Sequence, residues 1–138
     1  MRFVDTNILL YAISRDPAEE GKATIANEII DGGDIGLSVQ VLQEFYVQAT
    51  RATREDAITH AEAAGLVEAW CRFPAQVTSV EVMRAALATR SRFGISYWDA
   101  AILEAARTLG CSVVLSEDLD PATDYDGIRV EDPFRHAP

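Results

Sequence analysis

Four acidic side chains lie where the sequence changes from a predicted strand or loop to a predicted helix. They are Asp5, Glu44, Asp99 and Asp118. A parallel sheet flanked by helices would gather these carboxylates at one end, although they are spread over most of the chain. Carboxylate oxygens are hard ligands that select Mg²⁺ or Mn²⁺, and such ions serve phosphoryl chemistry. The pattern therefore predicts a metal site that acts on phosphate esters.

Each acid also has an ordinary structural interpretation. Asp5 could cap the helix that follows it, and Asp99 could form a Ser-x-x-Asp capping box with Ser96. Asp118 could begin a turn, and Glu44 could be a solvated residue on the flank of a helix. Four acids at equivalent ends of elements would repel one another, however, and a fold has little reason to gather them without a cation. The set as a whole favours the metal interpretation.

Neutral side chains accompany the first and the last of these acids at a spacing of two residues. Asn7 and Ser116 supply oxygens that could orient a carboxylate or a metal-bound water, and capping is the alternative role for both. His60 and His136 have no acid at a useful spacing and are predicted to be surface residues. The chain has no Gly-x-Ser-x-Gly and no Gly-x-Gly-x-x-Gly motif, so neither a serine hydrolase nor a nucleotide-cofactor enzyme is supported.

The length and composition predict one globular domain. A chain of 138 residues with 49% hydrophobic content can bury a full core, so residues 1–138 are expected to form a single domain. Cys71 and Cys111 lack Cys-x-x-Cys spacing and flanking histidines, which predicts buried, reduced thiols. No apolar run approaches the length of a membrane span, and Asp5 interrupts what would be a signal sequence. We therefore expect a cytoplasmic protein with no membrane partner.

The net charge of −10 argues against a protein that binds nucleic acid mainly through counterion release. A bound divalent cation would reverse the local potential that an incoming phosphate meets, which reduces this conflict. The basic residues are almost all arginines, which could reflect bidentate phosphate contacts or merely a GC-rich coding sequence. The better candidates for phosphate contacts are Arg51, Arg54, Arg84, Arg90 and Arg92.

Strands and helices alternate along the chain. Strands are predicted at residues 2–4, 35–37, 76–77, 111–115 and 127–130. Helices are predicted at residues 7–13, 18–30, 38–49, 53–71, 80–92 and 96–109. This alternation indicates an α/β fold, a three-layer α/β/α sandwich with a mainly parallel sheet of about five strands and right-handed crossovers.

Two of these helices carry more specific predictions. The helix from residue 53 is expected to open with a capping box between Thr53 and Asp56. Its predicted core stripe is Ile58, Ala61, Gly65 and Ala69. The helix over 80–92 is expected to turn its more apolar stripe toward the core. That stripe is Val80, Met83, Leu87 and Ser91.

The four acids lie in four short segments: residues 3–12 (FVDTNILLYA), 37–46 (LSVQVLQEFY), 96–102 (SYWDAAI) and 115–119 (LSEDL). Taken in order, these segments resemble the acidic motifs of the PIN-domain nucleases, and in particular those of VapC-type toxins. The segment Asp132-Pro133-Phe134 is also similar to the usual Asn-Pro-Phe ending of the family, with aspartate in place of asparagine. The resemblance covers nearly the whole chain.

The resemblance implies a metal-dependent endoribonuclease, the toxin of a type II toxin-antitoxin system. Its acid set carries over to this chain as Asp5, Glu44, Asp99 and Asp118, with the first and third as primary ligands of one or two Mg²⁺ or Mn²⁺ ions. A metal-activated water would hydrolyse phosphodiester bonds of single-stranded or loop RNA. The resemblance further implies a homodimer and a small antitoxin protein that covers the active site.

Two other functions stay open. A phosphate-handling α/β module, such as a phosphatase or phosphoacceptor domain, also places acids at strand ends, although this chain lacks the Asp-x-Asp pair of such phosphatases. A non-catalytic PIN interaction scaffold is the second alternative, and the complete acid set argues against it. Glu117 and Asp120 add negative charge beside Asp118, and the sequence leaves open which of them faces the metal.

Overall fold

A five-stranded parallel sheet forms the centre of the computed structural model, which describes residues 1–136. The strands are β1 (Arg2–Val4), β2 (Ile35–Ser38), β3 (Ala75–Gln76), β4 (Val113–Leu115) and β5 (Arg129–Glu131). They are arranged in the order β3-β2-β1-β4-β5, and every neighbouring pair is parallel. The predicted parallel sheet of about five strands is confirmed, although β4 begins two residues later than the apolar run from Cys111 suggested.

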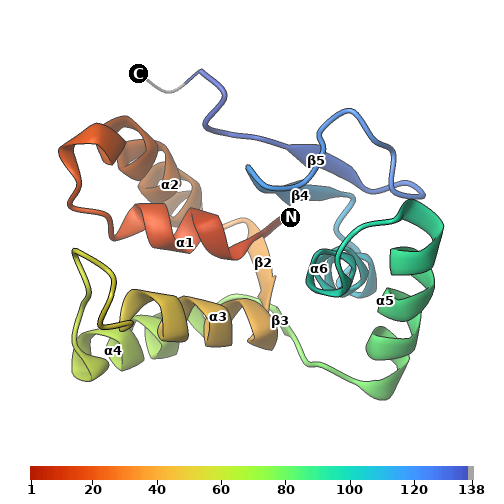
Figure 1. Cartoon of the computed structure of the whole chain (residues 1–138), viewed down its shortest axis with the longest axis horizontal. Coiled ribbons are helices and arrows are strands. Elements are labelled where there is room, and N and C mark those ends of the chain that lie inside the picture. Colours follow the sequence, from red (N-terminus) through yellow and green to blue (C-terminus); the bar gives the residue numbers. More distant parts are fainter. Residues whose placement is uncertain (137–138) are drawn as a thin grey trace.

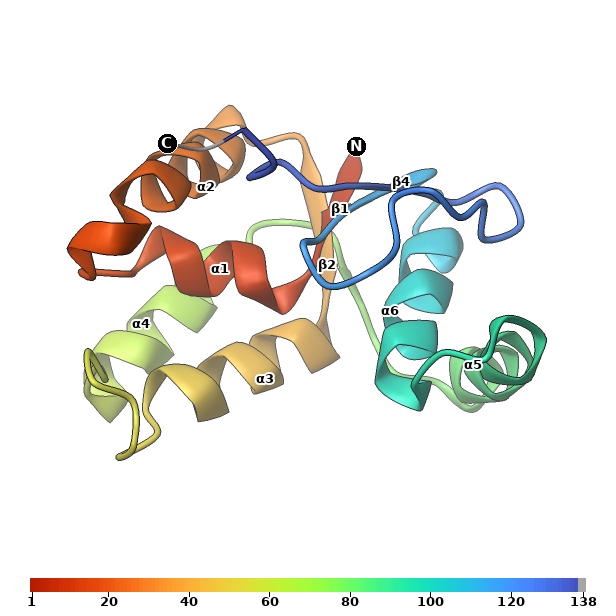
Figure 2. The same cartoon turned by 45° about the horizontal axis from the view of Figure 1, so that its top comes forward.

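Helices cover both faces of this sheet. They are α1 (Thr6–Ala12), α2 (Glu20–Gly32), α3 (Val39–Ala49), α4 (His60–Trp70), α5 (Val80–Phe93) and α6 (Tyr97–Thr108), with a short 3-10 helix, η1 (Pro17–Glu19), before α2. Figures 1 and 2 show α1 to α4 on one side of the strands and α5 with α6 on the other. The predicted α/β/α layering is therefore confirmed. No helix within residues 1–136 is long and apolar enough to cross a membrane.

Strand order reverses between β1 and β4. From β1 the chain moves outward through β2 to β3 on one side, and it then returns to β4 and β5 on the other side. Phe3 and Val4 of β1 and Val114 and Leu115 of β4 are fully buried, since helices cover these central strands on both faces. In open parallel sheets, a crevice for ligands forms outside the carboxyl ends of the strands at such a reversal.

Side-chain caps fix where most of the helices begin. The capping residues are Asp5, Ser38, Thr59, Ser79 and Ser96, each of which accepts a backbone N–H of the first helical turn. These bonds satisfy donors that have no partner inside the helix. Two of the predicted acids are positioned directly by these caps, because Asp5 is itself a cap and Asp99 is the third residue after Ser96.

The predicted start of the helix at residue 53 is wrong. Helix α4 begins at His60, because Thr59 and Glu62 form the reciprocal capping box that the prediction assigned to Thr53 and Asp56. The predicted core stripe fails with it: Ala63 and Trp70 are the buried residues of α4. Of the predicted stripe, Ile58 is buried but lies before the helix, and the three helical members are exposed.

The predicted orientation of the helix over 80–92 is also wrong, although its position is right. Val82, Ala86 and Thr89 face the core of the molecule. The more apolar stripe, with Val80, Met83, Leu87 and Ser91, faces outward and is exposed. Small side chains are inside because α5 packs closely against α6, where Ala86 contacts Ala100 and Ala101.

Both cysteines were predicted to be buried, reduced thiols, and the prediction of burial is right for one of them. Both are free thiols, and Cys111 is buried beside the sheet, but Cys71 is exposed just after α4.

Candidate active site

The four predicted acids line one small cleft at the reversal of strand order. Its volume is about 130 Å³. Its acidic lining residues are Asp5, Glu44, Asp99 and Asp118. They come from the end of β1, from α3, from α6 and from the loop after β4, so the fold brings together residues from four separate segments. The expectation that topology gathers these carboxylates is therefore met.

Asp5 is at once a helix cap and a lining residue of the cleft. Its Oδ1 accepts the backbone N–H of Thr6 at 2.7 Å, and its Oδ2 accepts the hydroxyl of Ser116 at 2.7 Å. Only 6% of the residue is exposed. Burial raises the pKa of Asp5 to about 6 and outweighs both hydrogen bonds, which favour the charged form, while the charges of Asp118 and Glu44 raise it further.

Ser116 connects the acids of β1 and of the loop after β4. Besides donating to Asp5, its Oγ accepts the backbone N–H of Asp118 at 3.1 Å and the side-chain amide of Asn7 at 3.3 Å. Its side chain is fully buried, so these contacts hold it in one position. Ser116 therefore contacts both Asp5 and Asp118, as its predicted orienting role requires.

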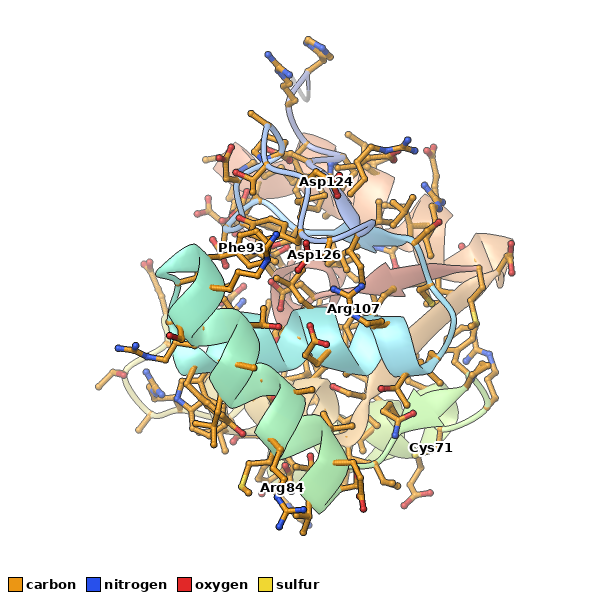
Figure 3. All side chains as sticks on the ribbon, turned by 90° about the vertical axis from the view of Figure 1, so that its right-hand side faces the viewer. Cys71, Arg84, Phe93, Arg107, Asp124 and Asp126 are labelled. Atoms are coloured by element: carbon orange, nitrogen blue, oxygen red, sulfur yellow. The ribbon has the colours of Figure 1, made fainter. Side chains whose placement is uncertain are left out.

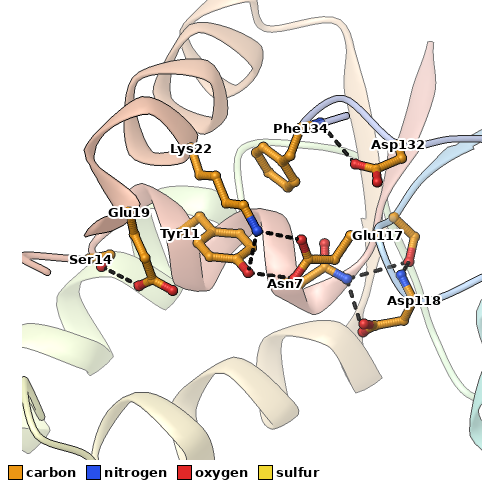
Figure 4. A network of polar contacts seen from close by, with 10 residues as sticks. Asn7, Tyr11, Ser14, Glu19, Lys22, Glu117, Asp118, Asp132 and Phe134 are labelled. Atoms are coloured by element: carbon orange, nitrogen blue, oxygen red, sulfur yellow. Dashed lines mark hydrogen bonds and ion pairs between the residues drawn. The ribbon is translucent and has the colours of Figure 1, made fainter. Parts of the chain in front are cut away.

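Asn7 combines a bound amide nitrogen with a free oxygen. Its Nδ2 donates to Asp118 Oδ2 at 3.1 Å, as Figure 4 shows. The same nitrogen also donates to Ser116. Its Oδ1 is buried and has no hydrogen-bond partner among the described residues. Buried polar atoms are nearly always paired, so an unpaired carbonyl oxygen at the edge of an acidic cleft is available to a cation or to water.

Glu44 is held by two neutral donors. Thr6 Oγ1 donates to Glu44 Oε2 at 2.8 Å, and Gln40 Nε2 donates to Oε1 at 2.8 Å. Thr6 is the residue that links α1 to α3 at this point, and its role was not predicted from the sequence. The available signal was its position, since the first residue after a strand-end acid lies at the same edge of the sheet.

Asp99 lies in the first turn of α6, as the capping pattern predicted. Its backbone N–H is bound by Ser96 Oγ at 3.1 Å, while its carboxylate lines the cleft. Partial burial raises the pKa of Asp99, a hydrogen bond with Ser96 lowers it, and the charges of Asp118 and Glu44 raise it again. Ser96 is thus the cap of α6, and Asp99, which donates its N–H to that cap, lines the cleft with its side chain.

The neighbouring acids Glu117 and Asp120 are engaged elsewhere. Glu117 forms an ion pair with Lys22 at 3.0 Å and accepts the hydroxyl of Tyr11 (Figure 4). Asp120 accepts the Thr123 hydroxyl and the backbone N–H of Ala122 within its own turn. Neither carboxylate lines the cleft. Of the acids in this loop, Asp118 is the one that lines the cleft.

The predicted arginine candidates for phosphate contacts lie outside the cleft. Arg92 is held by both oxygens of Asp126, which lies beside Phe93 and Arg107 in Figure 3. Arg54 pairs with Asp56 at 2.9 Å, in a groove that borders the cleft at Asn7 and Leu10. Within the described part of the chain, no Arg, Lys or His side chain lines the acid cleft, and none forms an ion pair with its four acids.

The donor set suits a hard divalent cation, although the acids are not drawn together around one point. Among residues 1–136, no three Asp, Glu, His or Cys side chains are arranged to hold a metal ion as they stand. The cleft nevertheless offers four carboxylates without a compensating cation, two raised carboxyl pKa values and the unpaired Asn7 oxygen. Each of these features is relieved by a bound cation, so the residues fit Mg²⁺ or Mn²⁺ in chemical type.

The histidines are surface residues, as predicted. His60 Nδ1 lies 2.8 Å from the hydroxyl of Tyr46, and His136 is exposed near the carboxyl end. The cleft also contains an aromatic residue that the site prediction did not include, Trp98, which precedes Asp99.

Comparisons with known proteins agree with this fold. The model of the PIN domain family matches residues 2–127. No curated protein matches the chain in sequence. Among solved structures, a toxin-antitoxin complex from Klebsiella pneumoniae is similar with a TM-score of 0.69 at 19% identity, over 96% of this chain and 98% of that one.

Two further solved structures extend the comparison. VapC20 of Mycobacterium tuberculosis, described as a sarcin-ricin loop cleaving toxin, gives a TM-score of 0.66 at 16% identity, over 91% of this chain and 93% of that one. VapBC2 from Rickettsia felis, bound to a DNA fragment from its promoter, gives 0.64 at 15% identity, over 94% and 96%. At such identities these likenesses show a shared fold.

Proposed function

Because the chain belongs to the PIN domain family, we propose that it is a metal-dependent endoribonuclease, the toxin of a type II toxin-antitoxin pair. The observation that carries this proposal is the cleft lined by Asp5, Glu44, Asp99 and Asp118 without a cationic neighbour. Acids gathered in this way repel one another, and a divalent ion removes that repulsion. Solved structures of similar fold include a sarcin-ricin loop cleaving toxin and a toxin-antitoxin complex.

In this proposal Asp5 and Asp99 are the primary metal ligands, and Glu44 and Asp118 are further ligands or orient the others. When bound, Mg²⁺ or Mn²⁺ supplies Lewis acidity that activates water for in-line attack on phosphorus and offsets charge on the phosphoryl oxygens. Hydrogen bonds from Ser116, Asn7 and the residue after Asp5 hold the carboxylates in place. Ser116 donates to Asp5, Asn7 donates to Asp118, and Thr6 donates to Glu44.

The chain itself supplies the proton acceptor. The attacking water must lose a proton, and a carboxylate of the cleft accepts it. A bound divalent cation would lower the carboxyl pKa of its ligands Asp5 and Asp99, so the raised values of the metal-free protein do not carry this step. No side chain needs to form a covalent intermediate, because hydrolysis by water requires only the acceptor, the ion and a positioned phosphate.

The partner of this toxin is proposed to be a small antitoxin that covers the cleft. The chain carries a net charge of −10, and the cleft has no cation of its own among the described residues. A cationic side chain placed among the carboxylates would therefore neutralise them in the same way as a metal ion. The antitoxin is expected to shield the cleft and the helices around residues 42–70.

A homodimer is proposed through the outer face of α5. Val80, Met83 and Leu87 are exposed at helical spacing, which forms an apolar stripe on this helix. Glu81, Arg84 and Arg90 are also exposed on α5. Arg84 is seen on its outer side in Figure 3. A two-fold contact needs a patch that complements itself, and a stripe flanked by charges of both signs meets this need.

Metal-stripped protein and a labelled single-stranded RNA test the proposed activity. Mg²⁺ or Mn²⁺ should restore cleavage, whereas Ca²⁺ should not, because its coordination shell is larger and looser. Equal cleavage in chelator would contradict the proposal. A non-catalytic scaffold is the second candidate. Metal binding without turnover of RNA would identify that scaffold, and turnover of a phosphate monoester alone would identify a phosphatase.

A further inference from the structure

Trp98 is an exposed aromatic side chain on the wall of the acid cleft. It is 63% exposed, more than any other large apolar side chain within residues 1–136. It also lines the cleft together with Asp99 and Asp118. Exposing an indole to water is unfavourable. Because this exposed indole lies beside the carboxylates of the cleft, its position suggests a role in binding.

The indole of Trp98 is held by its neighbours. Trp98 lies in the first turn of α6, two residues after the capping residue Ser96, so its backbone is fixed. Its ring meets the ring of Tyr97 edge to face, with centroids 5.1 Å apart and an interplanar angle of 79°. Tyr97 in turn packs against the small apolar cluster that joins α5 to α6. An indole that is held by its neighbours and is largely exposed can stack on a base with little loss of entropy.

The charge of the protein indicates why such a platform is needed. With a net charge of −10 and no cationic side chain in the described lining of the cleft, electrostatic attraction contributes little to RNA affinity. Stacking of a base on an aromatic side chain does not depend on charge and tolerates any base. Paired bases inside a helix have their faces covered by their neighbours, so only an unpaired base can stack on a side chain in this way.

We propose that Trp98 is the platform on which an unpaired RNA base stacks, next to the phosphodiester held at the acid cleft. The position of the phosphodiester rests on the proposed nuclease function, whereas the stacking of the base does not. The inference defines the substrate at this point of the cleft as single-stranded or looped RNA. An exposed tryptophan can also belong to a subunit interface, and the α5 stripe proposed for that contact does not line the cleft.

The test is binding of a short single-stranded RNA in Ca²⁺, measured by tryptophan fluorescence. The chain has two tryptophans, and Trp70 is buried, so RNA reaches only Trp98 directly. We expect the RNA to quench the emission of wild type and to leave that of Trp98→Phe unchanged. The same RNA annealed to its complement, or made with abasic sites, should cause no quenching.

The affinities provide the second readout. Trp98→Ala should weaken binding of the single strand by about tenfold or more, whereas Trp98→Phe, which keeps an aromatic face, should stay within about threefold. Val77→Ala is the matched control, since Val77 is 60% exposed but does not line the cleft. It should bind RNA as wild type does.

Two results would overturn the inference: wild-type affinity in Trp98→Ala, or equal quenching by duplex or abasic RNA. If the affinity of Trp98→Ala is unchanged while its oligomeric state changes, Trp98 belongs to a subunit interface instead. Failure of the nuclease proposal is recognised separately. If Asp99→Asn cleaves RNA normally, the proposed nuclease site is wrong. The fluorescence measurement would still report whether a base stacks on Trp98.

Discussion

The hydroxyl of Ser116 donates a hydrogen bond of 2.7 Å to Asp5 Oδ2. This bond joins the end of β4 to the end of β1, where the order of strands in the sheet reverses. Both side chains are buried, and the same Ser116 oxygen accepts the backbone N–H of Asp118. The bond favours the ionised form of Asp5, and it opposes the effect of burial, which raises the pKa of that carboxyl to about 6.

Replacing Ser116 by alanine should raise the pKa of Asp5 further, since the charged form loses its hydrogen bond. We expect RNA cleavage to fall about tenfold to a hundredfold, the usual effect of losing a group that orients a metal ligand. The acidic limb of the pH–rate profile should move to higher pH. Ser116→Thr keeps the hydroxyl and should restore both the rate and the profile. An unchanged profile in Ser116→Ala would contradict the positioning role.

The contribution of Asp5 to the stability of the metal-free protein should decrease as the pH rises from about 4 to about 7. Burial places the folded-state pKa of Asp5 at about 6, above its ordinary value of 3.8, so the folded state binds this proton more tightly. The contribution is complete below the unfolded pKa and is lost as the pH rises through the folded one. A pKa difference of this size corresponds to about 3 kcal/mol.

Denaturant unfolding in chelator, at a series of pH values, measures this effect. Other groups titrate in the same range, so the informative quantity is the stability of wild type minus that of Asp5→Asn, which cannot ionise. This difference should fall by about 2–3 kcal/mol between pH 4 and pH 7. Asp31→Asn, which changes an exposed acid of α2, should run parallel to wild type. Parallel curves for wild type and Asp5→Asn would contradict the prediction.

Glu117 should stabilise the fold through Lys22 and have little effect on catalysis. Lys22 Nζ lies 3.0 Å from Glu117 Oε2, and it also lies over the ring of Tyr11. A double-mutant cycle of Lys22→Met and Glu117→Gln should give a coupling of about 1 kcal/mol, because the pair is only partly exposed. Glu117→Gln should cleave RNA within about threefold of wild type, whereas Asp118→Asn should lose most activity. Equal losses in both variants would place Glu117 in the active site.

The α5 stripe predicts a specific change of oligomeric state. Leu87→Glu puts a carboxylate into the proposed two-fold contact, close to the same carboxylate of the second subunit. The two charges repel each other, so sedimentation should show a monomer in place of the dimer. Val47→Glu, at an equally exposed apolar position on α3, is the control and should leave the dimer intact. A monomeric wild type, or a Leu87→Glu protein that remains dimeric, would exclude this interface.

Much of the fold could be predicted from the sequence because local signals agreed with the global arrangement. Residues adjacent in the sequence were sufficient to predict the strand β1, the capping residue Ser96 and the glycine-rich end of α2. The acid cleft followed from topology, because the carboxyl ends of parallel strands meet at one edge of the sheet.

The errors occurred where tertiary packing decides between two local patterns. In α5, the larger apolar side chains form one stripe and the small ones another, and close packing on α6 selects the small stripe, with Ala86 at its centre. Before α4, two Ser/Thr-x-x-Asp/Glu patterns compete. Asp56 instead binds Arg54 and the backbone of Arg15, so the cap forms at Thr59. Thr6 was missed because its partner Glu44 is distant in sequence.

Cleavage of a single-stranded RNA by wild type and by Asp99→Asn, across a titration of Mn²⁺ into metal-stripped protein, tests the central claim most directly. Asparagine preserves the shape of the side chain, so the change removes one carboxylate with little effect on α6. Wild-type cleavage should rise from zero and saturate with Mn²⁺, while Asp99→Asn should remain at least about a hundredfold slower. Cleavage that is independent of Mn²⁺, or equal in the two proteins, would contradict the account.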